Sequence, residues 1–400
     1  MSAAVFTKPF TQQEPISDVA IERVSDILST GRLHRYNTVG GEISEAAQLE
    51  QDYANYQNVK FCVAVTSGGQ AMQIAMRAAG VKPGDRILAN AYTLAPVPGA
   101  MFATGAVPVF VEIDQNWHID IDDLERKAKD TGAGFLMLSH MRGHIADMDR
   151  ITAVCARYKI TMIEDCAHTM GATWKGTLSG NFGAVACFST QTYKHLNSGE
   201  GGILTTNDPD IAARAVIMSG SYMLYSGHGA RPDEAAFARN KLDAPNCSAR
   251  IDNMRAALIR DQLPELGDKI ARWNERYDAL ETGLAKIPAL RLPSRAAHEK
   301  FVGSSIQFQA PGLGPERIPD FIAACGQRGV ELKWFGAADP QGFTSRYDSW
   351  QYLGELPDLA TTKSVLSVTC DMRVPLTFSL DDCNLIARII GEEATQLTQS

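Results

Sequence analysis

The chain has 400 residues, of which 45% are hydrophobic and 21% are charged. These proportions are typical of a soluble globular protein and exclude a disordered chain. The formal charge of −8 argues against a nucleic-acid partner, which would favour a basic surface. No apolar run reaches the ~18 residues of a membrane span, and no basic segment followed by an apolar one begins the chain. We therefore expect a cytoplasmic protein without a membrane or nucleic-acid partner.

The eight cysteines indicate neither a disulfide framework nor a metal site. They are scattered without a CxxC pair, and most have apolar neighbours, where a free cysteine behaves as a small hydrophobe. Cys166 and His168 form the one close Cys/His pair, and such a spacing without a second pair is weak support for zinc. No metal is predicted.

Short apolar runs alternate with helical patterns between about residues 60 and 210. Such alternation is typical of a largely parallel sheet with helices on both faces. Strands are predicted at residues 61–65, 86–89, 107–113, 134–139, 160–163, 184–188 and 202–206, and helices at 17–28, 42–56, 70–79 and 148–158.

The second half of the chain has a different pattern. Residues 224–247 are polar and predict a long loop with one short helix, and residues 251–285 predict a long, interrupted or curved helical region. The remaining strands are predicted at 291–293, 304–308 and 330–334, and the helices at 316–328 and 380–393. The pattern predicts a large α/β domain over 1–260, which includes the N-terminal helices, and a small C-terminal α+β domain over 261–400.

Three of the predicted strands end in residues that could carry chemistry. Residues 67–70 (Ser-Gly-Gly-Gln) begin a helix and could bind a phosphate, although an ordinary strand–helix turn is the commoner explanation. Asp165 could bind a metal, act as an acid or base, pair with a cationic ring, or cap a helix. Lys194 could form a Schiff base with a carbonyl group, or be a solvated surface lysine.

The three features together favour one cofactor. A phosphate site, a carboxylate and a lysine on strand ends are what pyridoxal phosphate (PLP) requires. The lysine binds the aldehyde, the carboxylate keeps the pyridine nitrogen protonated, and the loop holds the phosphate. The combination predicts a PLP site.

The order and wording of these segments resemble the DegT/DnrJ/StrS-type family of PLP-dependent sugar aminotransferases, which have the aspartate-aminotransferase-like (type I) fold. The resemblance covers nearly the whole chain, and its most specific part is the run from Lys194 to Gly202 with Glu164 and Asp165 upstream. The resembling segments are 8–10, 63–72, 81–85, 105–111, 143–148, 163–165, 188–202 and 250–258.

The resemblance implies a role for each matching residue. Lys194 would form the Schiff base and move the proton between the substrate and the cofactor, and Asp165 would pair with the pyridine nitrogen. His168 stands where the family often has glutamine near the cofactor's O3′. Ser189 would hold the phosphate together with residues 69–70. Because the lysine is retained, the family's dehydratase branch, which replaces it with histidine, is not expected.

Three departures from the family pattern concern the cofactor site. Gly69 replaces a threonine, and Ser248 stands where the family has an asparagine that reaches the neighbouring subunit's phosphate. Either Leu94 or Tyr92 would cover the cofactor ring. The predicted cofactor-binding set is therefore Ser67, Gly68, Gly69, Gln70, Tyr92, Leu94, Asp165, His168, Ser189, Lys194 and Ser248.

Four residues are candidates for substrate binding. Arg142 stands where the family often has an aromatic residue, and it would bind a substrate carboxylate or merely a surface acid. Trp334 and Arg346 lie in a segment rich in aromatic and cationic residues, which would bind a ring or nucleotide or else pack the small domain. His34 belongs to an N-terminal loop that in this family often approaches the substrate.

The sequence as a whole predicts a PLP-dependent aminotransferase, a homodimer with its active sites at the interface. The resemblance to the family implies glutamate or glutamine as the donor and a keto sugar or related cyclic ketone as the acceptor. The alternatives are an enzyme for a small keto acid or an aminocyclitol ketone, and a PLP-binding protein without turnover. A nicotinamide-dependent dehydrogenase is disfavoured because the chain has no GxGxxG motif.

Overall fold

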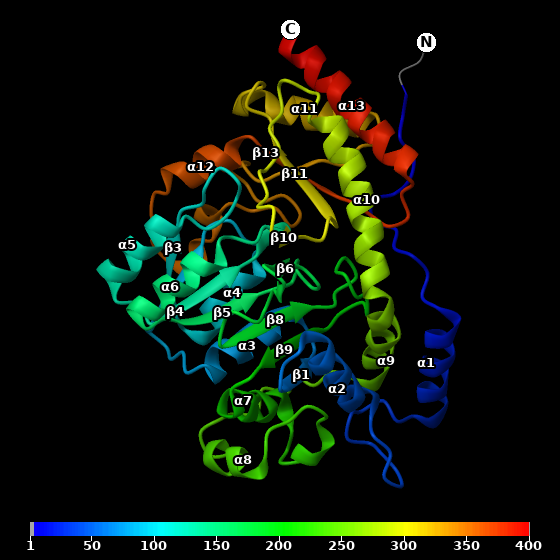
Figure 1. Ribbon diagram of the computed structural model, residues 1–400, viewed down its shortest axis with the longest axis vertical. Helices are drawn as coiled ribbons and strands as arrows, with labels where there is room; N and C mark the ends of the chain where they lie inside the picture. Colours follow the sequence, from blue (N-terminus) through cyan, green and yellow to red (C-terminus); the bar gives the residue numbers. More distant parts are fainter. Residues whose placement is uncertain (1–3, 400) are drawn as a thin grey trace.

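The computed structural model describes residues 4–399. The protein has two parts stacked along its longest axis: a larger one around a central sheet, and a smaller one formed mainly by the C-terminal third (Figure 1). Helix α10 (Leu266–Leu284) runs from the larger part up along the smaller one, and both ends of the described chain lie at the far end of the smaller part (Figure 1).

The central sheet has seven strands in the order β1-β9-β8-β5-β4-β2-β3. β9 is antiparallel to both of its neighbours, whereas the other strands share one direction. Most of their residues are buried, which explains why the strands appear as continuous apolar runs in the sequence. The strands are β1 (Phe61–Val65), β2 (Arg86–Asn90), β3 (Val107–Val111), β4 (Phe135–Ser139), β5 (Thr161–Asp165), β8 (Val185–Ser189) and β9 (Gly202–Thr206).

Helices cover both faces of this sheet because successive strand residues point to opposite sides. On β2, Ile87 and Ala89 pack in the core beneath α3, α4 and α7, whereas Leu88 packs in the core beneath α5 and α6. α2 and α9 cover the other half of that second face. These helices are α2 (Glu45–Gln57), α3 (Gly68–Ala78), α4 (Pro96–Thr104), α5 (Ile121–Thr131), α6 (Met148–Tyr158), α7 (Pro209–Gly220) and α9 (Asn253–Gln262).

The smaller part contains an antiparallel three-stranded sheet in the order β11-β13-β12. α10, α11 and α13 contribute to its apolar core. Phe6 and Phe10 also lie in this core and pack edge-on against Phe378, so the start of the chain returns to the C-terminal part. The elements are β11 (Ser305–Gln309), β12 (Lys333–Trp334), β13 (Thr369–Arg373), α11 (Ile318–Gln327) and α13 (Leu380–Gln399).

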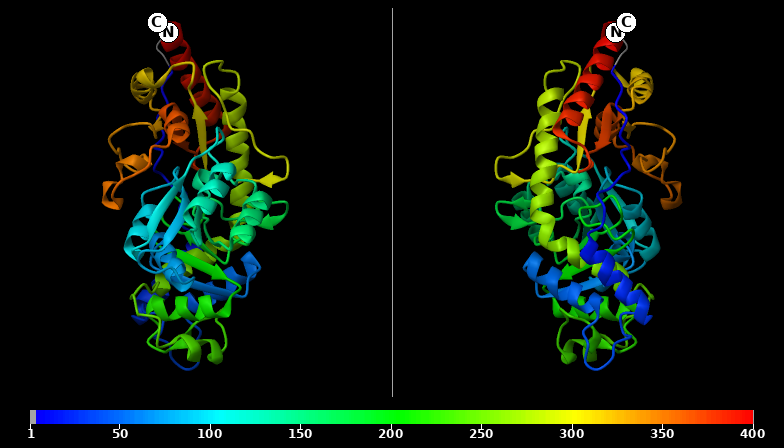
Figure 2. Two further views of the ribbon diagram at one scale, coloured as in Figure 1. Left: turned by 90° about the vertical axis from the view of Figure 1, so that its left-hand side faces the viewer. Right: turned by 90° about the vertical axis from the view of Figure 1, so that its right-hand side faces the viewer.

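Peripheral elements complete the fold. β10 pairs with β6 in a second small sheet, and its loop extends from the side of the molecule (Figure 2). α1 packs beside α9 (Figure 1). These elements are α1 (Asp18–Thr30), β6 (Thr173–Trp174), β7 (Thr177–Leu178), α8 (Glu234–Asn240), β10 (Glu299–Lys300) and α12 (Ala360–Ser367).

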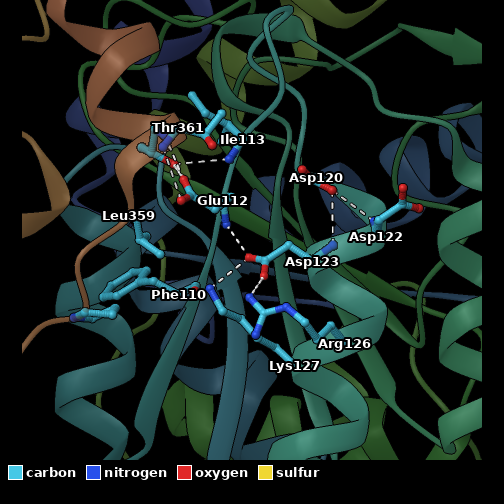
Figure 3. A network of polar contacts seen from close by, with 12 residues as sticks. Phe110, Glu112, Ile113, Asp120, Asp122, Asp123, Arg126, Lys127, Leu359 and Thr361 are labelled. Carbon is cyan, nitrogen blue, oxygen red and sulfur yellow. Dashed lines mark hydrogen bonds and ion pairs between the residues drawn. The ribbon is translucent and has the colours of Figure 1, made fainter.

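A polar network attaches the smaller part to the edge of the central sheet (Figure 3). Glu112 directly follows β3, and its carboxylate accepts hydrogen bonds from the backbone N–H groups of Thr361 (3.3 Å) and Thr362 (2.7 Å) in the first turn of α12. Its own N–H donates to Asp123 of α5 at 2.8 Å. α12 has no side-chain cap from its own N-cap residue. Glu112 of the larger part therefore caps α12, the helix that immediately precedes β13 in the chain.

The α/β fold with a mostly parallel sheet is confirmed, and each predicted strand between residues 60 and 210 is present within about two residues. The helical region over 251–285 is also present, interrupted at Pro264. The predicted strand at 291–293 is wrong, because only Arg291 makes a single bridge, to Gln309. β13 was not predicted. The domain boundary at residue 260 stays a prediction.

Over residues 4–399, no helix combines the length and the apolar character that crossing a membrane requires.

Candidate active site

A cavity of about 530 Å³ opens where β1, β4, β5 and β8 end. Ligands of open α/β sheets bind at this position, outside the carboxyl ends of the strands. The cavity walls come mainly from the larger part, and Phe343 and Arg373 contribute from the smaller, C-terminal part. The predicted site residues that line it are Ser67, Gly68, Gly69, Leu94, Arg142, Asp165, His168, Ser189 and Lys194.

The first group in the cavity is the N-terminus of α3. Ser67 is the N-cap residue, and its Oγ accepts a hydrogen bond from the N–H of Gln70 at 3.1 Å. A Cβ atom on Gly68 would lie 2.8 Å from the Cβ of Ser189, so only glycine allows α3 and β8 to approach this closely. A helix N-terminus with a close backbone and two serines suits a bound phosphate.

The second group is Asp165, which ends β5 and is buried. Its Oδ2 accepts a hydrogen bond from Ser139 Oγ at 2.8 Å, and its Oδ1 accepts from the N–H of Ala167 at 3.1 Å. Thr93 Oγ1 in turn bonds to Ser139 Oγ at 2.8 Å. This chain from β5 through β4 to the loop after β2 fixes the carboxylate, which faces the cavity as the partner of a cationic ring nitrogen would.

The third group is Lys194, whose Nζ lies 2.9 Å from His168 Nε2. Burial and the nearby Arg142 lower the pKa of Lys194 to about 7. Burial and Lys194 hold the pKa of His168 well below its usual value, so this ring is neutral. A neutral imidazole nitrogen can accept a hydrogen bond from the amine. Lys194 is therefore a nucleophilic amine near neutral pH, unlike a solvated lysine.

The opposite end of the cavity is cationic. Arg142, in a 3₁₀ turn after β4, has the left-handed backbone angle φ 55° and is buried. Its Nη2 donates to Asp371 Oδ2 of β13 at 2.7 Å. Arg373, at the end of β13, lies over the ring of Tyr193 at 3.7 Å. The guanidinium groups of Arg142 and Arg373 each lie 4.9 Å from the centre of the Phe343 ring.

Comparisons with known proteins identify the family of this chain. A model of the DegT/DnrJ/EryC1/StrS aminotransferase family matches residues 16–336. The chain belongs to this family. Among curated relatives, dTDP-3-amino-3,4,6-trideoxy-alpha-D-glucose transaminase of Streptomyces venezuelae is 33% identical over 70% of this chain and 68% of its own length. L-glutamine:2-deoxy-scyllo-inosose aminotransferase of Streptomyces kanamyceticus is 28% identical over 79% of this chain and 75% of its own length.

A solved structure, that of S. venezuelae DesV in complex with a ketimine intermediate, is 26% identical. It has a TM-score of 0.78, and the match covers 94% of both chains. The predicted family, the aminotransferase fold, the enzyme class and the cofactor PLP are thereby confirmed.

The residues present fit PLP. The N-terminus of α3 and Ser189 offer an anion site, Asp165 faces the cavity, and Lys194 lines the same cavity. The cavity volume of about 530 Å³ lies within the range of small-molecule sites. The role of each residue toward the cofactor stays a prediction.

Several predicted residues lie outside the cavity. Tyr92 is buried edge-on against Phe335, 5.0 Å away, whereas Leu94 lines the cavity, so the geometry favours Leu94 as the residue beside the ring. Gln70 is not in the wall, and its N–H is already bonded to Ser67. His34 and Ser248 are exposed and do not line the cavity of this single chain.

Trp334 and Arg346 are used in packing the C-terminal part. Trp334 Nε1 donates to the carbonyl of Ser367 at 2.9 Å, and Arg346 forms a two-pronged ion pair with Asp348 at 2.9 and 3.0 Å. Neither lines the cavity. The packing explanation that the sequence left open for this segment fits these contacts.

His140, Glu164 and Cys166 form a buried group whose side-chain atoms lie within 4.8 Å of one another. Glu164 is fully engaged: it accepts hydrogen bonds from His140 Nε2 and from the N–H groups of Gly180, Phe182 and Gly183. The carboxylate therefore holds the loop before β8 in place, which explains the group without a metal.

The sequence did not predict Ser139, Arg373 or Phe343. Ser139 ends a predicted strand, as Asp165 and Ser67 do, so its position at the edge of the sheet was a signal. Arg373 follows an alternation of polar and apolar residues, Thr-Cys-Asp-Met-Arg, which is typical of a strand. Phe343 lies in a loop of the segment that is rich in aromatic and cationic residues, but nothing in the local pattern distinguished it from Trp334 and Arg346.

Proposed function

We propose that this aminotransferase transfers the amino group of glutamate or glutamine to a keto sugar or a related cyclic ketone. The observation that carries the chemistry is the single cavity that holds the N-terminus of α3, Asp165 and a lysine whose pKa is about 7. These are the groups that a PLP-dependent exchange of an amino group for a carbonyl oxygen needs.

Each residue has a defined task in this proposal. Bound PLP supplies the electron sink that stabilises negative charge at the substrate carbon. Asp165, oriented by Ser139, keeps the proton on the ring nitrogen. The N-terminus of α3 binds the phosphate. Lys194 Nζ takes the proton from the substrate carbon and returns one, which a pKa of about 7 allows in both directions near neutral pH.

The acceptor class is supported by the relatives. One relative is named as a transaminase of a dTDP-linked amino sugar and another as an aminotransferase of 2-deoxy-scyllo-inosose, so both a keto sugar and a cyclitol ketone are represented. The second candidate acceptor is a small keto acid, which the two arginines in the cavity favour.

The proposal is tested with purified protein and two separate half-reactions. We expect the visible absorbance of lysine-bound PLP and its loss upon addition of L-glutamate or L-glutamine. The aminated protein should then regain this absorbance with nucleotide-linked keto sugars or cyclitol ketones. Bound cofactor that no amino donor changes would favour the PLP-binding protein without turnover, and a protein that binds no PLP would contradict the assignment.

We propose further that the enzyme is a homodimer whose interface lies beside the phosphate site. Tyr222 and Met223 are 59% and 74% exposed, which is unusual for large apolar side chains. Arg250 lies over the Tyr222 ring and forms a bridge with Val65, two residues before Ser67. A partner that covers this face would also cover the exposed Ser248.

Analytical ultracentrifugation tests the dimer. We expect a dimer for the unaltered protein, and for Met223→Glu a monomer with a lower affinity for PLP. An unaltered protein that is monomeric and retains PLP would contradict the proposal.

We also propose a cytoplasmic location. All eight cysteines are free thiols in the structure, and seven are buried, as expected in a reducing compartment. Fractionation of the source cells with an antibody to the protein would test this location, and recovery in a membrane or secreted fraction would contradict it.

A further inference from the structure

The cationic end of the cavity has more positive charge than the protein itself neutralises. Arg142 is paired with Asp371 at 2.7 Å, but its buried Nε has no hydrogen-bond partner. No carboxylate among residues 4–399 lies within ion-pair distance of Arg373, whose guanidinium contacts the rings of Tyr193 and Phe343 instead. Arg373 is half-buried, and a partly desolvated guanidinium group without an ion-pair partner favours an anion at this end of the cavity.

No acid among residues 4–399 forms an ion pair with Arg373, and Glu200, which also lines the cavity, is exposed. Asp371 is fully buried, and its Oδ1 accepts a hydrogen bond from Gln307 at 2.7 Å while its Oδ2 holds Arg142. Asp165 is bonded to Ser139 and Ala167. Burial and then the neighbouring Arg142 lower the pKa of Arg373, whereas Tyr193 and Asp371 raise it, so the surrounding groups compensate this cation only in part.

The cofactor phosphate is not the expected anion at this end. The phosphate site lies between β1 and β8, at Ser67 and Ser189. Arg142 follows β4, which is two strands beyond β8 in the sheet, or about 10 Å at the usual strand spacing. Asp165 on β5 lies between them, so the two anion sites are on opposite sides of the position expected for the cofactor ring.

The contents of this end identify the kind of anion. Planar guanidinium groups match a carboxylate with two parallel hydrogen bonds. Phe343 contacts both arginines, and Leu94 and Met141 contribute further apolar wall. A small substrate with an apolar body and a carboxylate fits such a lining.

We infer that Arg142 and Arg373 form a subsite for a carboxylate on the substrate, close to the carbon that exchanges its amino group. The inference rests on the proposed aminotransferase function and narrows it. The carboxylate can belong to the amino-acid donor or to a keto-acid acceptor. The same two arginines can bind either compound, because the two half-reactions share one cavity.

The first experiment measures binding without turnover. Succinate, a dicarboxylate with no amino or keto group, is titrated into the PLP-loaded protein by calorimetry. We expect Arg373→Gln to weaken its binding by at least about tenfold, as the loss of a charged hydrogen-bonding partner does, and Arg373→Lys to weaken it less. Arg157→Gln is the control, because Arg157 is a surface arginine paired with Glu125 on α5. Cofactor content is recorded from the absorbance of each variant.

The second experiment separates donor from acceptor. The donor arm measures the half-reaction with L-glutamate and L-alanine, and the acceptor arm compares 2-oxoglutarate with a neutral cyclitol ketone. In Arg373→Gln we expect the KM of the carboxylated compounds to rise in one arm or in both, while the KM of the neutral ketone stays unchanged. The arm in which the KM rises identifies the source of the carboxylate.

Three results would overturn the inference. The first is that succinate does not bind the unaltered protein. The second is that it binds all variants equally. The third is that Arg373→Gln loses PLP but still binds succinate. Failure of the proposed function is a separate result, a protein that holds no PLP, and succinate binding to that protein still tests the subsite.

Discussion

The two walls of the cavity differ in how far their polar groups are satisfied within the protein. On the large-domain wall, Asp165 is held by Ser139 and Ala167, and Lys194 lies at hydrogen-bond distance from His168. On the wall from the C-terminal part, Arg373 has no ion-pair partner among the described residues. The first wall is organised before a ligand arrives, whereas the second is completed by one.

This difference separates two kinds of function. A cofactor-binding wall gains from fixed geometry, because PLP chemistry needs its lysine and carboxylate in place at every turnover. A substrate-binding wall can instead leave charge unsatisfied, so that the energy of binding depends on the correct partner. The Arg142–Asp371 ion pair joins the two walls.

The largest expected effect comes from the first wall. Lys194→Ala should lower the turnover rate by at least about 10⁴-fold, because it removes both the nucleophile and the proton carrier. Steady-state kinetics measures the rate, and visible absorbance measures the bound cofactor. Lys175→Ala, an exposed lysine paired with Asp149, is the matched control and should be unchanged. An active Lys194→Ala enzyme would mean that another group carries the chemistry.

The ion pair between the walls should matter for stability. Asp371→Asn leaves the buried Arg142 without its counter-charge, and removing one partner of a buried pair costs about 3–5 kcal/mol of unfolding free energy. Urea unfolding measures this loss. Asp122→Asn breaks the exposed pair with Arg150 and should cost less than about 1 kcal/mol. Equal effects of the two substitutions would contradict a structural joint between the walls.

A smaller effect is expected where the first wall only tunes the cofactor. Asp165→Asn should lower the turnover rate by about 10- to 100-fold, since an amide cannot supply the negative charge that holds a proton on the ring nitrogen. Ser139→Ala should lower it less, because Asp165 keeps its charge and its bond from Ala167. A larger loss of turnover in Ser139→Ala than in Asp165→Asn would show that Ser139, rather than Asp165, faces the ring.

The sequence predicted the first wall much better than the second. Ser67, Asp165 and Lys194 each follow an apolar strand closely, so a short stretch of chain carries the signal for each. Arg373 depends on β13, whose polar residues Thr369 and Asp371 are fully buried rather than exposed. They are satisfied by residues distant in the sequence, Trp117 for Thr369 and Gln307 and Arg142 for Asp371. Local patterns contain no information on such partners.

The segment after β12 is a second case in which the local sequence did not identify the residues that line the cavity. Its aromatic and cationic residues indicated a binding site, but Trp334 and Arg346 are bonded within the C-terminal part, and only Phe343 reaches the cavity. Composition identifies a segment able to bind a ring, whereas packing decides which of its side chains face the ligand.

The smallest effect, a shift in pH dependence, links the two walls through Lys194. Its pKa of about 7, below the usual 10.5, is set by burial and then by Arg142, with Arg373 acting in the same direction and Asp165 opposing them. The rate of PLP uptake by cofactor-free protein should therefore rise with pH to half its maximum near pH 7. Arg373→Gln should move this midpoint upward, because one of the charges that disfavour the protonated amine is removed.

The same shift has a consequence for stability with a definite sign. Between pH 7 and about 10 the unfolded chain keeps the lysine proton and the folded cofactor-free protein does not, so the contribution of Lys194 to the unfolding free energy rises with pH over that window. Lys194→Met should remove this part of the pH dependence. Stopped-flow measurement of PLP uptake from pH 6 to 9 gives the midpoint, and urea unfolding between pH 7 and about 10 gives the stability effect. An unchanged midpoint of PLP uptake in Arg373→Gln would place that arginine too far from Lys194 to share its substrate.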